Sequence, residues 1–281
     1  YFLFFDKKKL VKLYINKENI LFRCEAGKIA ELGTGHLISS ILYLKLLIRK
    51  SICKKKNIVF LVKVSKRYEL AKKILLKERL KFKILDVSTN DYSNNELDFI
   101  LKNKFKTIII DRIGAISSLF LKRLKNKNKK VILIDDGSKN KKKCDLAINS
   151  LIFKNLINNQ LSGFEYMILP SFFVKNKNKN KEIKKIEKVF VSFGGYDKND
   201  KNKKIYKIFS NFKNIQFYID SNNIKNGENI SSYNRSNFFK KMLESDLVIC
   251  SGGLTSFDAI NLNIPTLCIP QYKHQIRNVK I

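Results

Sequence analysis

A histidine follows two closely spaced glycines in the segment Gly33-Thr34-Gly35-His36. An apolar run at about 20–24 precedes this segment and a periodic apolar stretch at about 36–50 follows it, a pattern typical of a strand-to-helix turn. Glycines let the backbone approach a ligand, and the positive end of a helix favours an anion and a neutral imidazole. We therefore expect His36 to act as a general base near neutral pH. The same residues also fit a plain turn that His36 caps.

A second group of small and polar residues follows the apolar run "DLVIC" near the end of the chain. Its members are Ser251, Gly252, Gly253, Thr255, Ser256 and Asp258. Backbone N–H groups and hydroxyls at the start of a helix can hold a pyrophosphate, and a carboxylate can accept both hydroxyls of a ribose. We expect Asp258 in the first turn of that helix for this purpose. A helix-dipole partner on a solvated face is the alternative reading of Asp258.

Other polar residues follow further strand-like runs. Gly194 and Gly195 come after "VFVSF", where their amides can approach phosphate or sugar oxygens, although a plain turn would look the same. Gln275 follows the last apolar run and can reach a sugar or a phosphate. Asp111 and Asp135-Asp136 end two more runs. Without a further set of ligands, these carboxylates favour turns over a metal site, so we expect no metal.

The elements that position these residues alternate between short β-branched runs and helical stretches, which favours parallel sheets covered by helices. Expected strands lie at about 20–24, 57–62, 82–87, 106–110 and 131–135, and again at 187–195, 214–220, 246–250 and 265–270. Expected helices lie at about 36–50, 66–79, 94–103 and 115–127, then from about 200, at 235–244 and from Thr255. Ligands bind at the carboxyl ends of strands in such sheets. The sequence predicts two Rossmann-like doubly wound α/β domains that face a cleft.

The expected domain boundaries follow shifts in composition. Residues 1–18 form an N-terminal extension, 19–173 an α/β domain that carries the His36 loop, and 187–281 an α/β nucleotide-binding domain that is expected to be shortened at its end. The polar, Lys- and Asn-rich stretch 174–186 has the composition of a linker.

The net charge of +33 comes from 57 Lys and Arg against 24 Asp and Glu. The excess is mostly scattered lysine without an aromatic-interleaved basic motif, so we expect no nucleic-acid partner. No apolar run approaches the length of a membrane span and no signal peptide is evident, so we expect a cytoplasmic protein without membrane insertion. The five cysteines show no metal-type spacing and indicate neither a disulfide framework nor a zinc site.

Taken together, these motifs resemble those of nucleotide-sugar enzymes with the two-domain glycosyltransferase B architecture. More narrowly, they resemble the pseudaminic-acid pathway hydrolase that releases UDP from UDP-2,4-diacetamido-2,4,6-trideoxy-β-L-altropyranose, and its spore-coat polysaccharide relatives. The resemblance rests on the segments "RCEAGKIAELGTGH", "DDGSKNKKKCDLAINS", "GFEYMIL", "VSFGGYD" and "SGGLTSFDAINLNIPTLCIP", followed by the HQxxN pattern at 274–278.

The resemblance implies that His36 activates the water that attacks the anomeric carbon, with inversion and without a metal or other cofactor. It also implies that residues of four loops hold the UDP-sugar: Arg23, Gly33, Gly35, Gly194, Gly195, Ser251, Gly252, Gly253, Thr255, Ser256, Asp258 and Gln275. A glycosyltransferase that uses a sugar or lipid acceptor in place of water, and a non-catalytic sugar-nucleotide-binding protein, are the alternative functions. The oligomeric state is left open.

Overall fold

The chain contains two compact units, Tyr1–Ile168 and Leu169–Ile281. The computed structural model describes residues 19–27, 33–64, 68–86, 94–150, 159–163, 166–170, 183, 185–194, 197, 200–220, 227–234 and 237–279. Ile168 packs into the core of the first unit and Leu169 into the core of the second. The expected extension 1–18 and most of the expected linker 174–186 lie outside the described residues, so these boundaries stay predictions.

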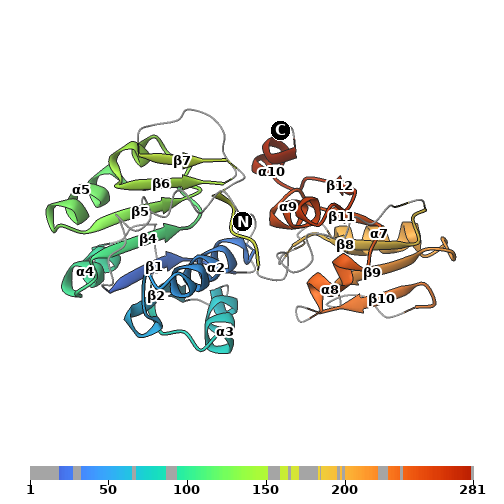
Figure 1. Cartoon of the computed structure of the whole chain (residues 1–281), viewed down its shortest axis with the longest axis horizontal. Helices are drawn as coiled ribbons and strands as arrows, with labels where there is room; N and C mark the ends of the chain where they lie inside the picture. The colour runs from blue at the N-terminus through green and yellow to red at the C-terminus, as the bar shows by residue number, and fades with distance from the viewer. Residues whose placement is uncertain are drawn as a thin grey trace. The chain divides into compact units, whose positions relative to one another are not determined.

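The first unit is built on one parallel sheet. Its strands are β1 (Ile20–Cys24), β2 (Ile58–Val64), β3 (Phe82–Asp86), β4 (Thr107–Asp111), β5 (Lys130–Ile134), β6 (Leu146–Asn149) and β7 (Gln160–Ser162). They are ordered β3-β2-β1-β4-β5-β6-β7, so the chain reverses its direction of winding between β1 and β4 (Figure 1). Open α/β sheets bind ligands at such a switch point, and here it lies beside the His36 loop.

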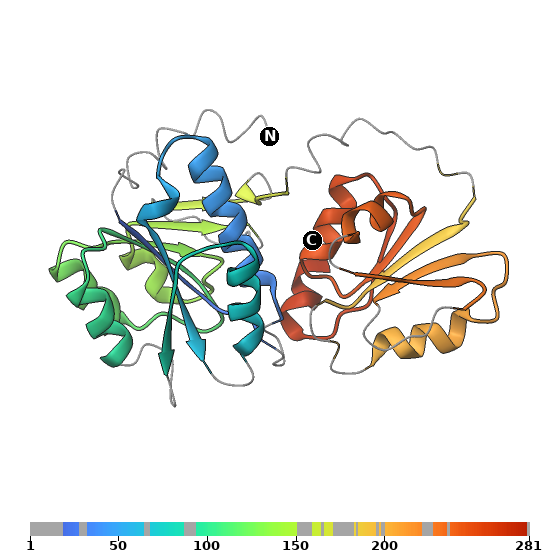
Figure 2. The same cartoon turned by 90° about the horizontal axis from the view of Figure 1, so that it is seen from below.

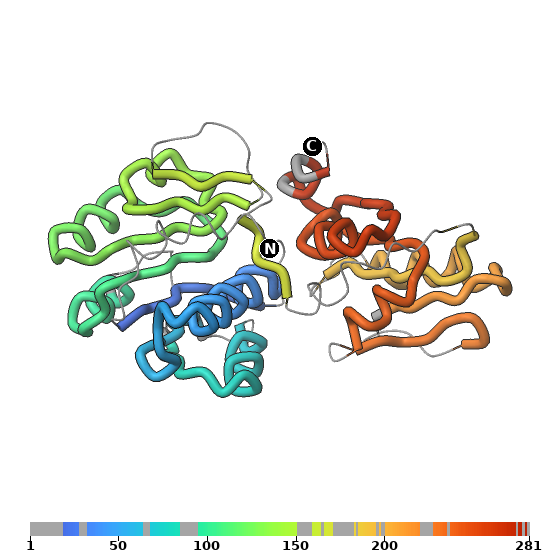
Figure 3. The backbone as a smooth tube through the Cα atoms, in the orientation of Figure 1, coloured from blue at the N-terminus to red at the C-terminus, as the bar shows by residue number. Residues whose placement is uncertain are grey.

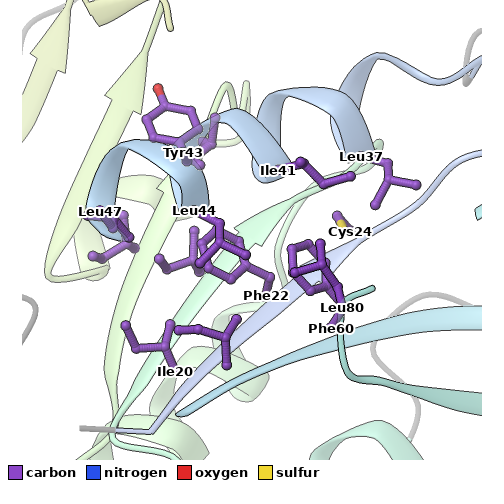
Figure 4. Close-up of a cluster of buried hydrophobic side chains, with 14 of the residues drawn as sticks. Ile20, Phe22, Cys24, Leu37, Ile41, Tyr43, Leu44, Leu47, Phe60 and Leu80 are labelled. Atoms are coloured by element: carbon purple, nitrogen blue, oxygen red, sulfur yellow. The ribbon is translucent and has the colours of Figure 1, made fainter. Parts of the chain in front are cut away.

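Helices cover both faces of this sheet, as Figures 1 and 2 show. They are α2 (Gly35–Arg49), α3 (Glu69–Lys77), α4 (Asn94–Lys102) and α5 (Ser118–Asn126), with the short 3-10 helices η1 (Lys55–Asn57) and η3 (Lys139–Lys143). The apolar side chains of α2 and α3 pack on one face and those of α4 and α5 on the other. Figure 4 shows part of the first cluster, where Leu37, Ile41 and Leu44 of α2 lie over strand residues. This spacing of three and four residues fixes which side of α2 faces the sheet.

The second unit repeats the design with fewer strands. It contains β8 (Lys188–Ser192), α7 (Lys201–Phe209), β9 (Gln216–Asp220), β10 (Ile230–Tyr233), α8 (Phe238–Leu243), β11 (Leu247–Cys250), α9 (Leu254–Asn261), β12 (Thr266–Cys268) and α10 (Lys273–Val279). All neighbouring strands are parallel, in the order β10-β9-β8-β11-β12, and Figure 3 traces the path of the chain through them. The side chains of α7 pack on one face, and those of α8 and α9 on the other.

The two α/β units confirm the expected fold class. The expected strands and helices occur within a few residues of their predicted ends, while β6, β7, β10 and α10 were not predicted. Strands β6, β7 and β10 contain four, three and four residues and carry polar residues such as Gln160 and Ser231. Runs this short and mixed lack the periodicity that identifies a strand.

Arg23 anchors β1 to α4 through a buried network of charges. The Arg23 side chain is 1% exposed, and its guanidinium donates to Glu96 of α4 and to Glu25, each at 2.8 Å. Lys63 Nζ lies 3.6 Å from Glu25 Oε1, and Arg112 Nη1 lies 3.9 Å from Glu96 Oε2. Burial acts to lower the pKa of Arg23, but the charges of Glu96 and Glu25 outweigh it and raise the pKa. Each charge in the network therefore has a neighbour of opposite sign within 4 Å.

We expect Glu96→Gln to lower the free energy of unfolding of the first unit by about 3–5 kcal/mol, because it leaves two buried guanidinium groups with less compensation. The matched control is Glu78→Gln, which breaks the exposed Lys45–Glu78 ion pair of 2.7 Å. That control should cost at most about 1 kcal/mol. Urea unfolding of both variants measures the difference, and equal losses would show that the buried network contributes no more to stability than the exposed pair.

Candidate functional site

His36 is the second residue of α2 and forms a close contact with Asp111. The His36 Nδ1 lies 2.6 Å from Oδ1 of Asp111, whose side chain is 2% exposed, while the histidine side chain is 25% exposed. Ser40, one turn further along α2, donates to the other oxygen of Asp111 at 3.3 Å. A buried carboxylate accepts hydrogen bonds, so Nδ1 carries the proton and Nε2 is left as the proton acceptor.

The register of the sheet creates this pair. Asp111 ends β4 and lies opposite Cys24, the last residue of β1, across the switch point. The loop after β1 closes with a hydrogen bond of 2.9 Å from the Gly27 amide to the Gly33 carbonyl, and α2 begins two residues later. Gly33 has φ of 51°, a conformation that glycine adopts without strain. The sequence pattern identifies Asp111 only as a rim carboxylate; its role as the partner of His36 depends on the strand order.

The electrostatic state of His36 differs from the expected one. Burial acts to lower the pKa of His36, but the charge and hydrogen bond of Asp111, with smaller effects of Asp135 and Glu25, raise it above its ordinary value. The pKa of His36 is thus shifted in the direction opposite to the one expected from the helix end, because a carboxylate in direct contact outweighs a partial charge at the helix terminus. His36 is a stronger base than the sequence suggested.

The other candidates in the first unit have structural contacts. The guanidinium of Arg23 is bonded to the carboxylates of Glu25 and Glu96, so its binding to a substrate stays a prediction. Gly35 is the first residue of α2. Asp136 accepts from the Ser138 amide at 2.7 Å, as a turn residue does. Asp135 accepts from the Ser150 amide at 2.7 Å, which joins the chain after β5 to the chain after β6.

Neither a metal-binding cluster nor a membrane-spanning helix is found among the described residues. Across the described ranges, no group of three or more His, Cys, Asp or Glu side chains is arranged to hold a metal ion. In the same part of the chain, no helix is long and apolar enough to cross a membrane.

In the second unit, Ser251, Gly252 and Gly253 form the turn between β11 and α9. Gly252 has φ of 74°, and a Cβ atom placed on it would lie 2.7 Å from Cγ2 of Val279 and 3.5 Å from the Gln275 carbonyl. Glycine at this position therefore lets the loop pack against α10. No side chain caps the amino end of α9. The Gly252 amide of the turn is hydrogen-bonded to the sulfur atoms of Cys250 and Cys268.

Several polar side chains around this turn hold the turn itself. The Ser256 hydroxyl donates to the Gly253 carbonyl at 2.7 Å. The Gln275 amide accepts from the Gln271 amide N–H at 2.8 Å and donates to Ser251 Oγ at 3.5 Å. Ser256 and Gln275 are buried, whereas Thr255 is partly exposed at the start of α9. Ligand contacts by these residues stay predictions, and the side chains give the loop its shape.

Asp258 lies in the second turn of α9, not in the first, because the helix begins at Leu254. It faces a poorly solvated environment, and burial raises the pKa of Asp258 to about 7. Near neutral pH the carboxyl group is thus partly protonated, and it can donate one hydrogen bond as well as accept others.

The end of β8 carries the remaining candidates. Gly194 has φ of 83°, and nothing lies within 4 Å of the position that a Cβ atom would take on it, so space is open above it. Gly195 lies outside the described residues. Gln271, which sequence reasoning missed, donates from Nε2 to the Phe193 carbonyl at 3.0 Å, joining the ends of β8 and β12. The Oε1 atom of Gln271 is buried without a hydrogen-bond partner among the described residues. The sequence signal that could have identified Gln271 is its position directly after Pro270, where the last strand-like run ends.

Comparisons with known proteins agree with this fold. No family model matches the chain. It is 27% identical over 275 residues to the uncharacterized protein MJ1062 of Methanocaldococcus jannaschii, an alignment that covers 87% of this chain and 54% of that protein. The chain thus spans about half the length of this curated relative.

Solved structures show a similar architecture at low sequence identity. UGT89C1 of Arabidopsis thaliana in complex with UDP has a TM-score of 0.59 at 12% identity, covering 94% of this chain and 82% of that one. SsfS6, a glycosyltransferase of Streptomyces sp. SF2575 in complex with thymidine diphosphate, has a TM-score of 0.60 at 9% identity, covering 94% of this chain and 85% of that one. The UDP-GlcNAc 2-epimerase of Neisseria meningitidis bound to UDP-GlcNAc has a TM-score of 0.54 at 10% identity, covering 92% of this chain and 85% of that one. The chain has the two-domain, Rossmann-like glycosyltransferase B fold.

We expect Gly252→Ala to lower the free energy of unfolding of the second unit by about 2–4 kcal/mol, from left-handed backbone strain and from overlap with Val279. Gly194→Ala is the matched control, since it brings the same kind of strain into open space and should cost about 1–2 kcal/mol. Adding Val279→Ala to Gly252→Ala should bring the loss close to that of the control. Thermal unfolding measures all three, and a double variant no more stable than Gly252→Ala would rule out the overlap.

Proposed function

We propose that this chain binds a UDP-sugar and hydrolyses it to UDP and the free sugar. The observation that carries the proposal is the hydrogen-bonded pair of His36 and Asp111 at the carboxyl edge of the first sheet. A histidine whose Nδ1 is held by a buried carboxylate presents Nε2 as a general base.

In the proposed reaction, Nε2 of His36 accepts a proton from water as the water oxygen attacks the anomeric carbon. The bond between that carbon and the diphosphate oxygen breaks, UDP leaves with the bonding electrons, and the configuration inverts. Asp111 orients the imidazole and stabilises the imidazolium that forms. The charge of Asp111, which raises the His36 pKa, makes this proton transfer more favourable.

The second unit would bind the nucleotide. The amino end of α9, which no side chain caps, and the partly exposed Thr255 suit the oxygens of a pyrophosphate, and the open space above Gly194 suits a close approach of the ligand. Asp258 would bind the ribose hydroxyls. Complexes of similarly folded proteins with UDP, UDP-GlcNAc and thymidine diphosphate support a nucleotide ligand of this class.

A diacetamido-trideoxy sugar on the pathway to a nonulosonic acid or a surface polysaccharide is the substrate that the sequence resemblance favours. The second candidate function is transfer of the sugar to an acceptor hydroxyl. The same pair would then deprotonate that hydroxyl, and the fold shared with glycosyltransferases supports this alternative.

The test is to incubate the protein with a panel of UDP-sugars and to detect UDP and free sugar by mass spectrometry. We expect UDP release without an acceptor, and at least about a hundredfold loss of turnover in His36→Ala with UDP affinity retained. Lys45→Ala, an exposed position on the same helix, should retain full activity. Release only with an added acceptor would favour the transferase, and full activity of His36→Ala would remove the proposed base.

Asp111→Asn should change the pH profile as well as the rate. Only neutral His36 accepts a proton, so activity falls as the pH drops through the His36 pKa, which Asp111 raises. Removing that charge lowers the pKa, and the acidic limb of kcat/KM should move to lower pH while the maximal rate falls about 10²–10⁴-fold. An acidic limb at the same pH in both proteins would contradict the role of Asp111.

A further inference from the structure

Two cysteines lie side by side at the carboxyl ends of strands in the second sheet, next to the 251–253 turn. Cys250 ends β11 and Cys268 ends β12, and the two residues are paired directly in the parallel register. Their sulfur atoms are 3.9 Å apart. Neighbouring strands are about 4.8 Å apart, within the range of about 4.4–6.8 Å between Cα atoms that a disulfide spans. Rotation of the side chains can therefore bring the sulfurs to bonding distance while the strands stay in place.

The environment of Cys268 makes its thiol the reactive one. Its side chain is partly exposed, and the hydrogen bond with Cys250 leads several effects that lower the pKa of Cys268 to about 7, against the opposing effect of burial. Hydrogen bonds with Ser256 and with the Gly252 amide act in the same direction. Cys250 is buried, and its pKa is raised by the hydrogen bond with Cys268 and by burial. One sulfur is thus poised as a thiolate beside a protonated neighbour.

The three remaining cysteines differ in both respects. Cys24, Cys53 and Cys144 are buried, and burial raises the pKa of each thiol above its ordinary value. Thiolate character and exposure control reaction with oxidants, so these cysteines are expected to be inert under mild conditions.

We propose that Cys268 and Cys250 form a peroxide-sensitive dithiol that closes into a disulfide next to the 251–253 turn. The Cys268 thiolate attacks hydrogen peroxide, takes one oxygen to become a sulfenic acid, and water leaves after proton uptake. The Cys250 thiol then attacks the sulfenic sulfur, which releases a second water and forms the S–S bond. In total, two thiols lose two electrons and two protons, and one peroxide becomes two waters.

The disulfide changes the charge next to the turn. In the reduced protein the Gly252 amide is hydrogen-bonded to the Cys268 sulfur, which is largely anionic above pH 7. Oxidation replaces that anion with a neutral sulfur, while Asp258 of α9 still faces Cys250 with its own charge. A diphosphate at the turn then meets one negative charge fewer. This consequence rests on the proposed function, and it predicts that UDP binds more tightly to the oxidised protein.

The first experiment needs no ligand. Full-length protein is treated with stoichiometric hydrogen peroxide, and its intact mass and peptide map are recorded. We expect a loss of about 2 Da and a peptide linked through Cys250 and Cys268, reversed by dithiothreitol. Cys268→Ser and Cys250→Ser should not form the link, whereas the matched control Cys53→Ala should form it as the unaltered protein does. A wild-type protein that oxidises without this link overturns the proposal.

The second experiment measures UDP binding at pH 8 to the reduced and the oxidised protein by calorimetry. We expect a dissociation constant on the order of fivefold lower after oxidation, and no change on peroxide treatment of Cys268→Ser. Because linkage is reciprocal, saturating UDP should lower the reduction potential of the pair by about 20 mV for a fivefold effect. Equal affinities of the linked and reduced forms overturn the coupling. Absence of UDP binding in both forms refutes the nucleotide site and leaves the disulfide to be decided by the mass data.

Discussion

The parallel pairing of β1 with β4 is the constraint on which the contact between His36 and Asp111 depends. Its register sets Asp111 opposite Cys24 and therefore beside the helix that the loop after β1 leads into. The buried guanidinium of Arg23 holds the same strand to α4 on the other face of the sheet. Asp111 is buried at the end of the neighbouring strand and is also bonded by Ser40, so His36 meets a carboxylate that is held in place.

The fold followed from the sequence where patterns were long and regular. Helices such as α2, with apolar residues at every third or fourth position, were predicted to within a residue or two. The contacts of Arg23 with Glu96 and of His36 with Asp111 were not, because the partners in each are separated by more than seventy residues and meet only through strand order. Asp258 was placed one turn too early because the start of α9 cannot be read from propensity to within a residue.

The two units use polar residues at their strand ends in different ways. In the first, Asp111 binds Nδ1 of His36, and the other imidazole nitrogen is the base that we propose. In the second, Ser256 and Gln275 hold the shape of the turn between β11 and α9. The sequence motifs do not distinguish these two arrangements, which only the hydrogen-bond pattern separates.

The short edge strand β12 also bears on how the protein behaves in concentrated solution. It contains only three residues, and Leu267 at its centre is 52% exposed. Pro265 and Pro270 stand on either side of it, and proline lacks the amide hydrogen that a neighbouring strand would need. An incoming β-strand thus finds too short a ladder to extend the sheet, which protects this apolar edge against strand-to-strand aggregation.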